Sequence, residues 1–142
     1  MSANARRGEG GARVDYDFAV LRVVPRVHLG AFVNVGVVLH ARTAEFLALR
    51  TVTDLHALAK LAPGVDPALL ARYLQAWAAI CAGDETAGPV ALAPPSERFH
   101  WITAPRSDVL QSSPVHEGVC DDPVEALDEL FEVYVGSATG QR

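Results

Sequence analysis

The first third of the chain alternates apolar and polar residues with the two-residue period of β-strands. Over residues 15–24, apolar side chains fall on both faces of such a strand, which is typical of an interior strand covered on each side. Pro25 ends this strand, because proline cannot donate to a strand ladder. Residues 32–41 repeat the alternation, and the short link 41–44 predicts a hairpin into a third strand over 45–52. The three segments predict an antiparallel meander.

Helical patterns with clear boundaries follow. Asp54 is placed to cap a short helix that runs to about residue 61. Asp66, followed by proline, begins a longer helix that ends before Gly83. Its apolar stripe repeats at three- and four-residue spacing and consists of Leu70, Tyr73, Leu74, Trp77 and Cys81. A last helix over 122–135 starts at Asp122 with a capping-box pattern.

The passage between these helices predicts a Gly- and Pro-rich loop over 83–96 and two short extended pieces, near 98–103 and 109–112. On the first piece, Arg98 and His100 share one side, and Trp101 on the other side is free to anchor the segment in the core. The order of elements predicts an α+β fold: a central antiparallel sheet, made of the meander and short later strands, flanked by helices 66–82 and 122–135. We expect a single domain over residues 14–136, between a disordered tail (1–13) and a flexible one (137–142).

Composition narrows the classes of protein. The 142 residues suffice for one core, and 50% apolar with 20% charged residues is ordinary for a globular domain. No apolar run is long enough to span a bilayer, and residues 1–13 lack the apolar region of a secretory signal. Two cysteines are too few for a disulfide scaffold, so without an export signal we expect reduced thiols. A single lysine against eleven arginines suggests a GC-rich coding sequence, and we expect a bacterial cytoplasmic location. A net charge of -5 argues against a nucleic-acid-coating function.

Hydrogen-bond donors gather in residues 97–118, and a few more interrupt the apolar strands. Converging guanidinium, imidazole, amide and hydroxyl groups suit an anionic or phosphorylated ligand. The candidate binding residues are Arg22, Arg26, Asn34, Arg98, His100, Arg106, Ser107, Gln111, Ser113 and His116. In the structural alternative, Arg22 pairs with Asp17 or with a C-terminal carboxylate. The polar side chains of residues 97–118 then form hydrogen bonds with the backbone of their own segment. The remaining histidines, His28, His40 and His56, are interpreted as surface or strand-end residues.

Two chemical alternatives use the same region. Cys81, His100, His116 and Cys120 would be the ligands of a zinc site, but no close pair such as C-x-x-C is present, so we predict no metal and no cofactor. Nucleophilic catalysis would use Ser107, Ser112, Ser113 or a thiol with His100 or His116 as base. The serines lie in no Gly-x-Ser-x-Gly elbow, and the chain has no phosphate-binding loop.

The chain resembles a bacterial family, domain of unknown function 3037. The resemblance rests on YDFAVLRVVPRV at 16–27, FVNVGVVL at 32–39, ERFHWITAPRS at 97–107 and QSSPVHEG at 111–118, followed by Asp122-Pro123. Members are often encoded beside a HipA-like serine/threonine kinase, which implies that kinase as a partner. We therefore expect a non-catalytic cytoplasmic protein that binds a partner or an anionic ligand. The alternative is an enzyme acting on a phosphate or nucleotide bond, with a histidine as general acid/base and arginines holding charge.

Overall fold

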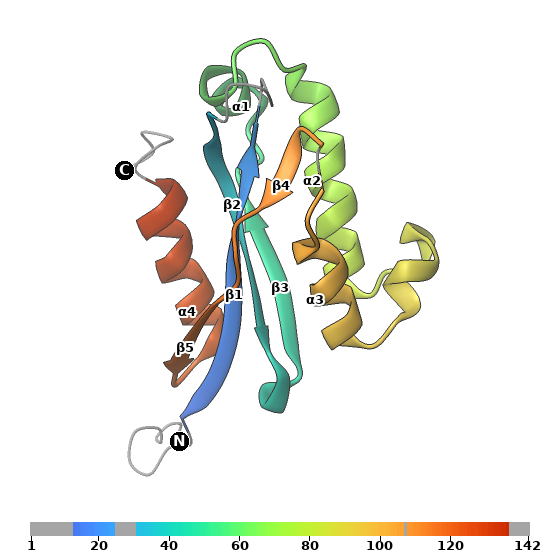
Figure 1. The fold of residues 1–142 in the computed structure, drawn as a ribbon, viewed down its shortest axis with the longest axis vertical. Coiled ribbons are helices and arrows are strands. Elements are labelled where there is room, and N and C mark those ends of the chain that lie inside the picture. Colours follow the sequence, from blue (N-terminus) through green and yellow to red (C-terminus); the bar gives the residue numbers. More distant parts are fainter. Residues whose placement is uncertain (1–12, 25–30, 107, 137–142) are drawn as a thin grey trace.

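One antiparallel sheet forms the middle of the molecule (Figure 1). The computed structural model describes residues 13–24, 31–106 and 108–136, and within these ranges the sheet has five strands. They are β1 (Val14–Val23), β2 (Val33–Ala41), β3 (Phe46–Thr51), β4 (Leu110–Ser112) and β5 (His116–Cys120). β1 is the central strand, with β2 along one edge and β4 and β5 along the other. The meander β1–β2–β3 confirms the sequence prediction.

Helices cover both faces of this sheet. α4 (Pro123–Phe131), which continues as a π-helical turn over Glu132–Gly136, lies on one face, and α2 (Pro67–Ala82) and α3 (Pro95–Thr103) lie on the other (Figure 1). α1 (Leu55–Leu61) joins β3 to α2. The carboxylates of Asp54, Asp66 and Asp122 each accept a backbone N–H two residues further on, as the capping patterns predict. The α+β prediction is therefore confirmed.

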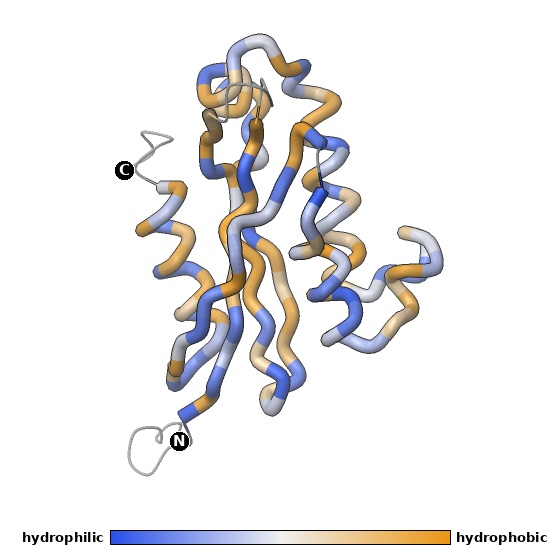
Figure 2. The backbone as a smooth tube through the Cα atoms, viewed as in Figure 1, coloured by the Kyte–Doolittle hydropathy of each residue, from blue (hydrophilic) through white to orange (hydrophobic). Residues whose placement is uncertain are grey.

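The core lies on both sides of β1 and β2. Leu21, Val37 and Leu39 are fully buried, which agrees with the prediction of an interior strand. Figure 2 shows hydrophobic positions along the middle of the sheet and hydrophilic positions at the end that holds the start of β1 and the β2–β3 hairpin. None of the helices in the described ranges is long and apolar enough to cross a membrane.

The largest correction concerns residues 98–103, which form part of helix α3 and not a strand. The run Pro94-Pro95 starts this helix, because proline at the first helical position needs no N–H partner. Phe99 and Ile102, three residues apart, face the core, so the apparent alternation was misleading. Trp101 is 36% exposed and does not anchor the segment in the core.

Smaller differences affect three other segments. The predicted loop 83–96 contains two 3-10 turns (Glu85–Ala87 and Pro89–Leu92). Tyr73 is exposed, so it does not belong to the buried stripe of α2. β5 was not predicted, because four of its five residues are polar or small and give no apolar signal. The tails 1–12 and 137–142, together with Arg26, His28 and Ser107, lie outside the described residues.

Candidate functional site

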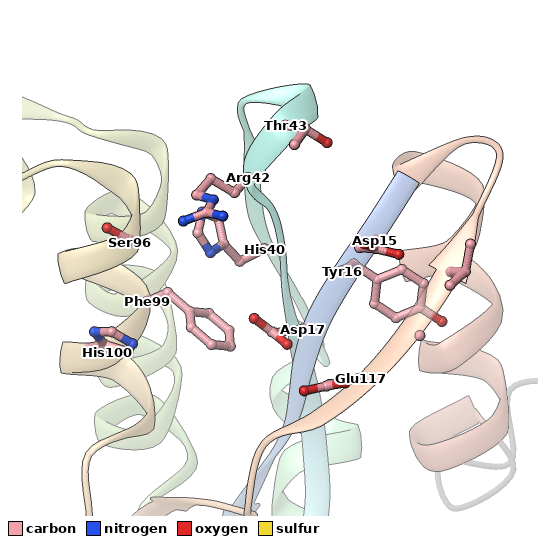
Figure 3. Close-up of a pocket in the computed structure, with 12 residues that line it drawn as sticks. Asp15, Tyr16, Asp17, His40, Arg42, Thr43, Ser96, Phe99, His100 and Glu117 are labelled. Carbon is pink, nitrogen blue, oxygen red and sulfur yellow. The ribbon is translucent and has the colours of Figure 1, made fainter. Parts of the chain in front are cut away.

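A cleft with a volume of about 680 Å³ opens between the sheet and helix α3 (Figure 3). Its lining residues are Asp15, Tyr16, Asp17, His40, Arg42, Thr43, Ser96, Phe99, His100, Glu117, Gly118 and Val119. Three of these side chains are carboxylates and one is an arginine. We call this site the acidic cleft.

The sheet register explains how distant residues meet in the acidic cleft. Asp17 of β1 lies directly opposite His40 of β2 on one side and directly opposite Glu117 of β5 on the other. Opposed residues of antiparallel strands project from the same face of a sheet. His40, Asp17 and Glu117 therefore form a row across the sheet, on the face that looks toward α3 (Figure 3).

The two carboxylates of this row are neighbours of like charge. Directly opposed like charges destabilise a pair of strands, since their Cβ atoms are only about 5 Å apart. Within the described residues, neither Asp17 nor Glu117 forms an ion pair, unlike Asp121 with Arg13 and Asp128 with Arg50. The acidic cleft thus holds two adjacent negative charges that these residues leave uncompensated.

His40 is the buried member of the row. It is only 7% exposed, and its ring packs against Phe99 with the centroids 5.5 Å apart. No described residue hydrogen-bonds its ring nitrogens. Burial lowers the pKa of His40 from its ordinary 6.5, and Asp17 opposes this change only in part. The imidazole is therefore neutral at pH 7 and offers one acceptor and one donor.

Close packing at β5 supports the outer wall of the acidic cleft. Gly118 lies directly opposite Tyr16, and a Cβ atom on Gly118 would overlap the tyrosine ring. Glycine at this position lets the ring lie over the β5 backbone, on the face opposite to Asp17 and Glu117.

Two of the four candidate arginines, Arg98 and Arg106, donate to backbone carbonyls. Arg98 donates from Nε to Ala93 and from Nη1 to the carbonyls of Ile80 and Cys81, which closes the end of α2. Arg106 donates to the carbonyls of Trp101 and Ile102, at the end of α3.

Arg106 also lies between two indole rings. Its guanidinium carbon is 4.7 Å from the ring centroid of Trp77 and 4.6 Å from that of Trp101. These three residues, with Tyr73 and Asp108, line a second hollow of about 340 Å³. The aromatic rings and the helix end account for the position of this arginine.

The other described candidates also have local partners. Gln111 donates to the carbonyl of Asp108. The Ser113 hydroxyl accepts from the N–H of Val20 and donates to the carbonyl of Pro114, so it joins β1 to the link before β5.

Asn34 and Arg22 are directly opposed across β1 and β2. Asn34 donates to the carbonyl of Tyr134, and the Arg22 guanidinium lies 4.1 Å from the Phe32 ring centroid. The Nε of Arg22 and the Oδ1 of Asn34 are buried and have no hydrogen-bond partner in the described residues. The predicted pair of Arg22 with Asp17 does not form, because five positions along the strand place them on opposite faces.

The two candidate histidines lie on opposite sides of the sheet. His100 lines the acidic cleft. His116 packs against Phe18, whose ring also contacts Tyr134 at the end of α4. Of the described candidates, only His100 belongs to the acidic cleft, so the structure does not bring the predicted donors together.

The zinc alternative is not supported by the geometry. Cys81 is buried in α2, where burial raises its pKa to about 12. Among the described residues, no three His, Cys, Asp or Glu side chains are arranged to hold a metal ion.

Sequence reasoning overlooked Asp17, His40 and Glu117. The interpretation of His40 as a surface or strand-end residue was correct about the strand end, since β2 ends at Ala41, but wrong about the surface, since the side chain is buried. A weak signal was present: Asp17 and His40 are polar residues in strands that are mostly apolar. The missing information was the pairing of β5 with β1, which adds Glu117 to them.

Comparison with known protein families identifies a match over most of the chain. Residues 18–135 match the family described as "Protein of unknown function (DUF3037)", as the resemblance predicted. No curated protein and no solved structure matches the chain.

Proposed function

We propose that this chain, which belongs to the DUF3037 family, is a non-catalytic binding module that holds its ligand in the acidic cleft. The observation that carries the proposal is His40, a side chain only 7% exposed whose ring nitrogens have no partner among the described residues. Neither nitrogen is among the fully buried side-chain atoms that lack a partner, so both are accessible from the cleft that His40 lines. A neutral imidazole there offers one acceptor and one donor to a ligand.

The geometry favours binding over the enzyme alternative. That alternative requires a histidine base and charge-holding arginines in one pocket, whereas His100 and His116 lie on opposite sides of the sheet. Arg98 and Arg106 donate to backbone carbonyls at the ends of helices. The acidic cleft itself combines groups from three strands and one helix, as ligand sites commonly do.

Amide NMR tests this proposal directly. The ¹⁵N-labelled chain would be titrated with three sets of small probes: guanidinium or ammonium compounds, phosphate or carboxylate anions, and neutral amides. We expect at least one set to cause saturable shifts at Thr43, Gly118 and Val119, which line the acidic cleft. If no set shifts these amides, or if saturable shifts map only elsewhere, the proposal is wrong.

The protein partner is a separate part of the proposal and rests on the family resemblance. We propose that a HipA-like kinase binds this chain in a bacterial cytoplasm. Co-expression of the two proteins followed by size-exclusion chromatography is the test, and fractionation of the native host checks the location. Co-elution that Glu117→Arg weakens would support the partner and place it at the acidic cleft. Separate elution of the two wild-type proteins would contradict it.

A further inference from the structure

We infer that the ligand of the acidic cleft carries a guanidinium group, which binds between Asp17 and Glu117; this inference rests on the proposed function. Three features of the acidic cleft support this inference: its charge, the unpartnered ring of His40, and the arrangement of acceptors around it.

Charge is the first step. Asp15, Asp17 and Glu117 line the acidic cleft against one arginine, Arg42. Asp17 is half-buried, and its opposition to Glu117 places two carboxylates within reach of a single cation. A cation between them would replace repulsion by attraction, whereas an anion would meet repulsion from both.

The second step is the hydrogen bonding of His40. This side chain is more than nine-tenths buried, faces the acidic cleft beside Asp17, and has no partner among the described residues (Figure 3). Four charged or titratable groups influence it: Asp17, Arg42, His100 and Arg98. Because the ring is neutral, it adds no positive charge and presents an acceptor nitrogen to an N–H donor.

The third step distinguishes guanidinium from ammonium. A guanidinium group is planar and has five N–H donors, so it can bond two carboxylates and an imidazole nitrogen at once. An ammonium group is compact and offers three donors without a flat face, so we expect it to bind more weakly.

The test compares two probes of the same shape. N-acetyl-arginine methylamide carries a guanidinium, and N-acetyl-citrulline methylamide carries a neutral urea group in its place. We expect the arginine probe to shift the amides of Thr43, Gly118 and Val119 saturably, and to bind at least about tenfold more tightly than the citrulline probe. The lysine equivalent should bind with intermediate affinity.

Matched variants test whether the two carboxylates bind the arginine probe. Glu117→Gln and Asp17→Asn keep the size of each side chain, and we expect each to weaken the arginine probe about tenfold. Glu129→Gln, on the exposed face of α4, is the control and should leave the affinity unchanged. Dispersed amide spectra of the unliganded variants show that they fold.

Each outcome has a distinct meaning. Equal binding of the citrulline probe, or anions binding at the cleft in place of cations, would overturn the inference and leave the proposed function standing. If no probe causes a saturable shift at the cleft, both the inference and the proposed function are wrong. Agmatine and a peptide with an internal arginine separate the sources: binding of agmatine supports a free guanidine, and binding of the peptide alone supports an arginine of a partner protein.

Discussion

Arg98 of helix α3 donates a hydrogen bond of 2.7 Å to the carbonyl oxygen of Cys81, in the last turn of helix α2. The same nitrogen also donates to the carbonyl of Ile80, and Nε donates to Ala93. The last four carbonyls of a helix lack partners within the helix, and a cation is favoured at that end. Arg98 therefore joins α2, α3 and the link between them.

Loss of the Arg98 guanidinium should destabilise the fold. Arg98→Met keeps the apolar stem but leaves the carbonyls of Ile80, Cys81 and Ala93 without this donor. We expect the free energy of unfolding to fall by about 2 kcal/mol in urea denaturation. Arg72→Met, on the exposed face of α2, is the control, and equal stability of the two variants would contradict the role.

Arg106 should control the environment of the two tryptophans. Trp77 and Trp101 are the only tryptophans of the chain, so intrinsic fluorescence reports on this cluster alone. Arg106→Lys keeps the charge but removes the flat guanidinium, and we expect a shifted emission spectrum and a stability loss of about 1 kcal/mol. An unchanged spectrum and unfolding curve would show that the stacking contributes nothing.

The opposed carboxylates should repel each other in the unliganded protein. Removing one charge by Glu117→Gln or Asp17→Asn should raise the free energy of unfolding at pH 7 by about 0.5 kcal/mol. The double variant should gain less than the sum of the two single gains, because the repulsion can be removed only once. Additive gains in this double-mutant cycle would contradict direct repulsion.

His40 should make stability depend on pH below neutrality. Its pKa in the folded protein is below the ordinary 6.5, mainly because burial disfavours the charged ring. Well above pH 6.5 the ring is neutral in both states, and the stability is fully present. As the pH falls through 6.5, His40 is protonated in the unfolded chain before it is protonated in the folded chain, so stability is lost.

Unfolding curves at intervals from pH 7.5 to pH 5 measure this slope. The slope should be smaller in His40→Gln, while His56→Gln, at an exposed position of α1, should keep it. If the slope is the same in both variants, groups other than His40 cause the pH dependence of stability.

The two thiols should differ in reactivity. Burial raises the pKa of Cys81 to about 12, and this residue is 3% exposed. The pKa of Cys120 is also raised, by burial and then by Asp122 and Asp121, but this residue is only half-buried. With iodoacetamide at pH 8, mass spectrometry should find Cys120 modified at least about tenfold faster than Cys81 in the native protein. Similar rates in the native state would contradict the burial of Cys81.

Local signals predicted most of the elements correctly. The capping aspartates, the prolines that follow Asp66 and Asp122, and Gly83 act within a few residues, so they determine where α1, α2 and α4 begin or end whatever the rest of the chain does. The strand prediction for residues 98–103 was wrong because a short segment with two buried positions fits a strand or a helix equally well. The prolines at 94 and 95 were the better signal.

The candidate site, in contrast, could not be predicted from local signals in the sequence. Residue types alone suggested that Arg98 and Arg106 bind an anion, but their partners are carbonyls at helix ends. The sequence does not show which backbone carbonyls the fold places near an arginine. Asp17, His40 and Glu117 gave no signal one by one, because each lies in a different strand that also holds other polar residues.

The amino-acid order by itself determined the meander, the helix caps and the family, since these depend on neighbouring residues or on the whole linear pattern. Only the tertiary structure decided which polar groups meet. Pairing β5 with β1 brings Glu117 beside Asp17 across 100 positions of chain, and the packing of α3 covers His40. Such contacts depend on strand register and helix docking, which arise from the burial of the entire core and from no local pattern.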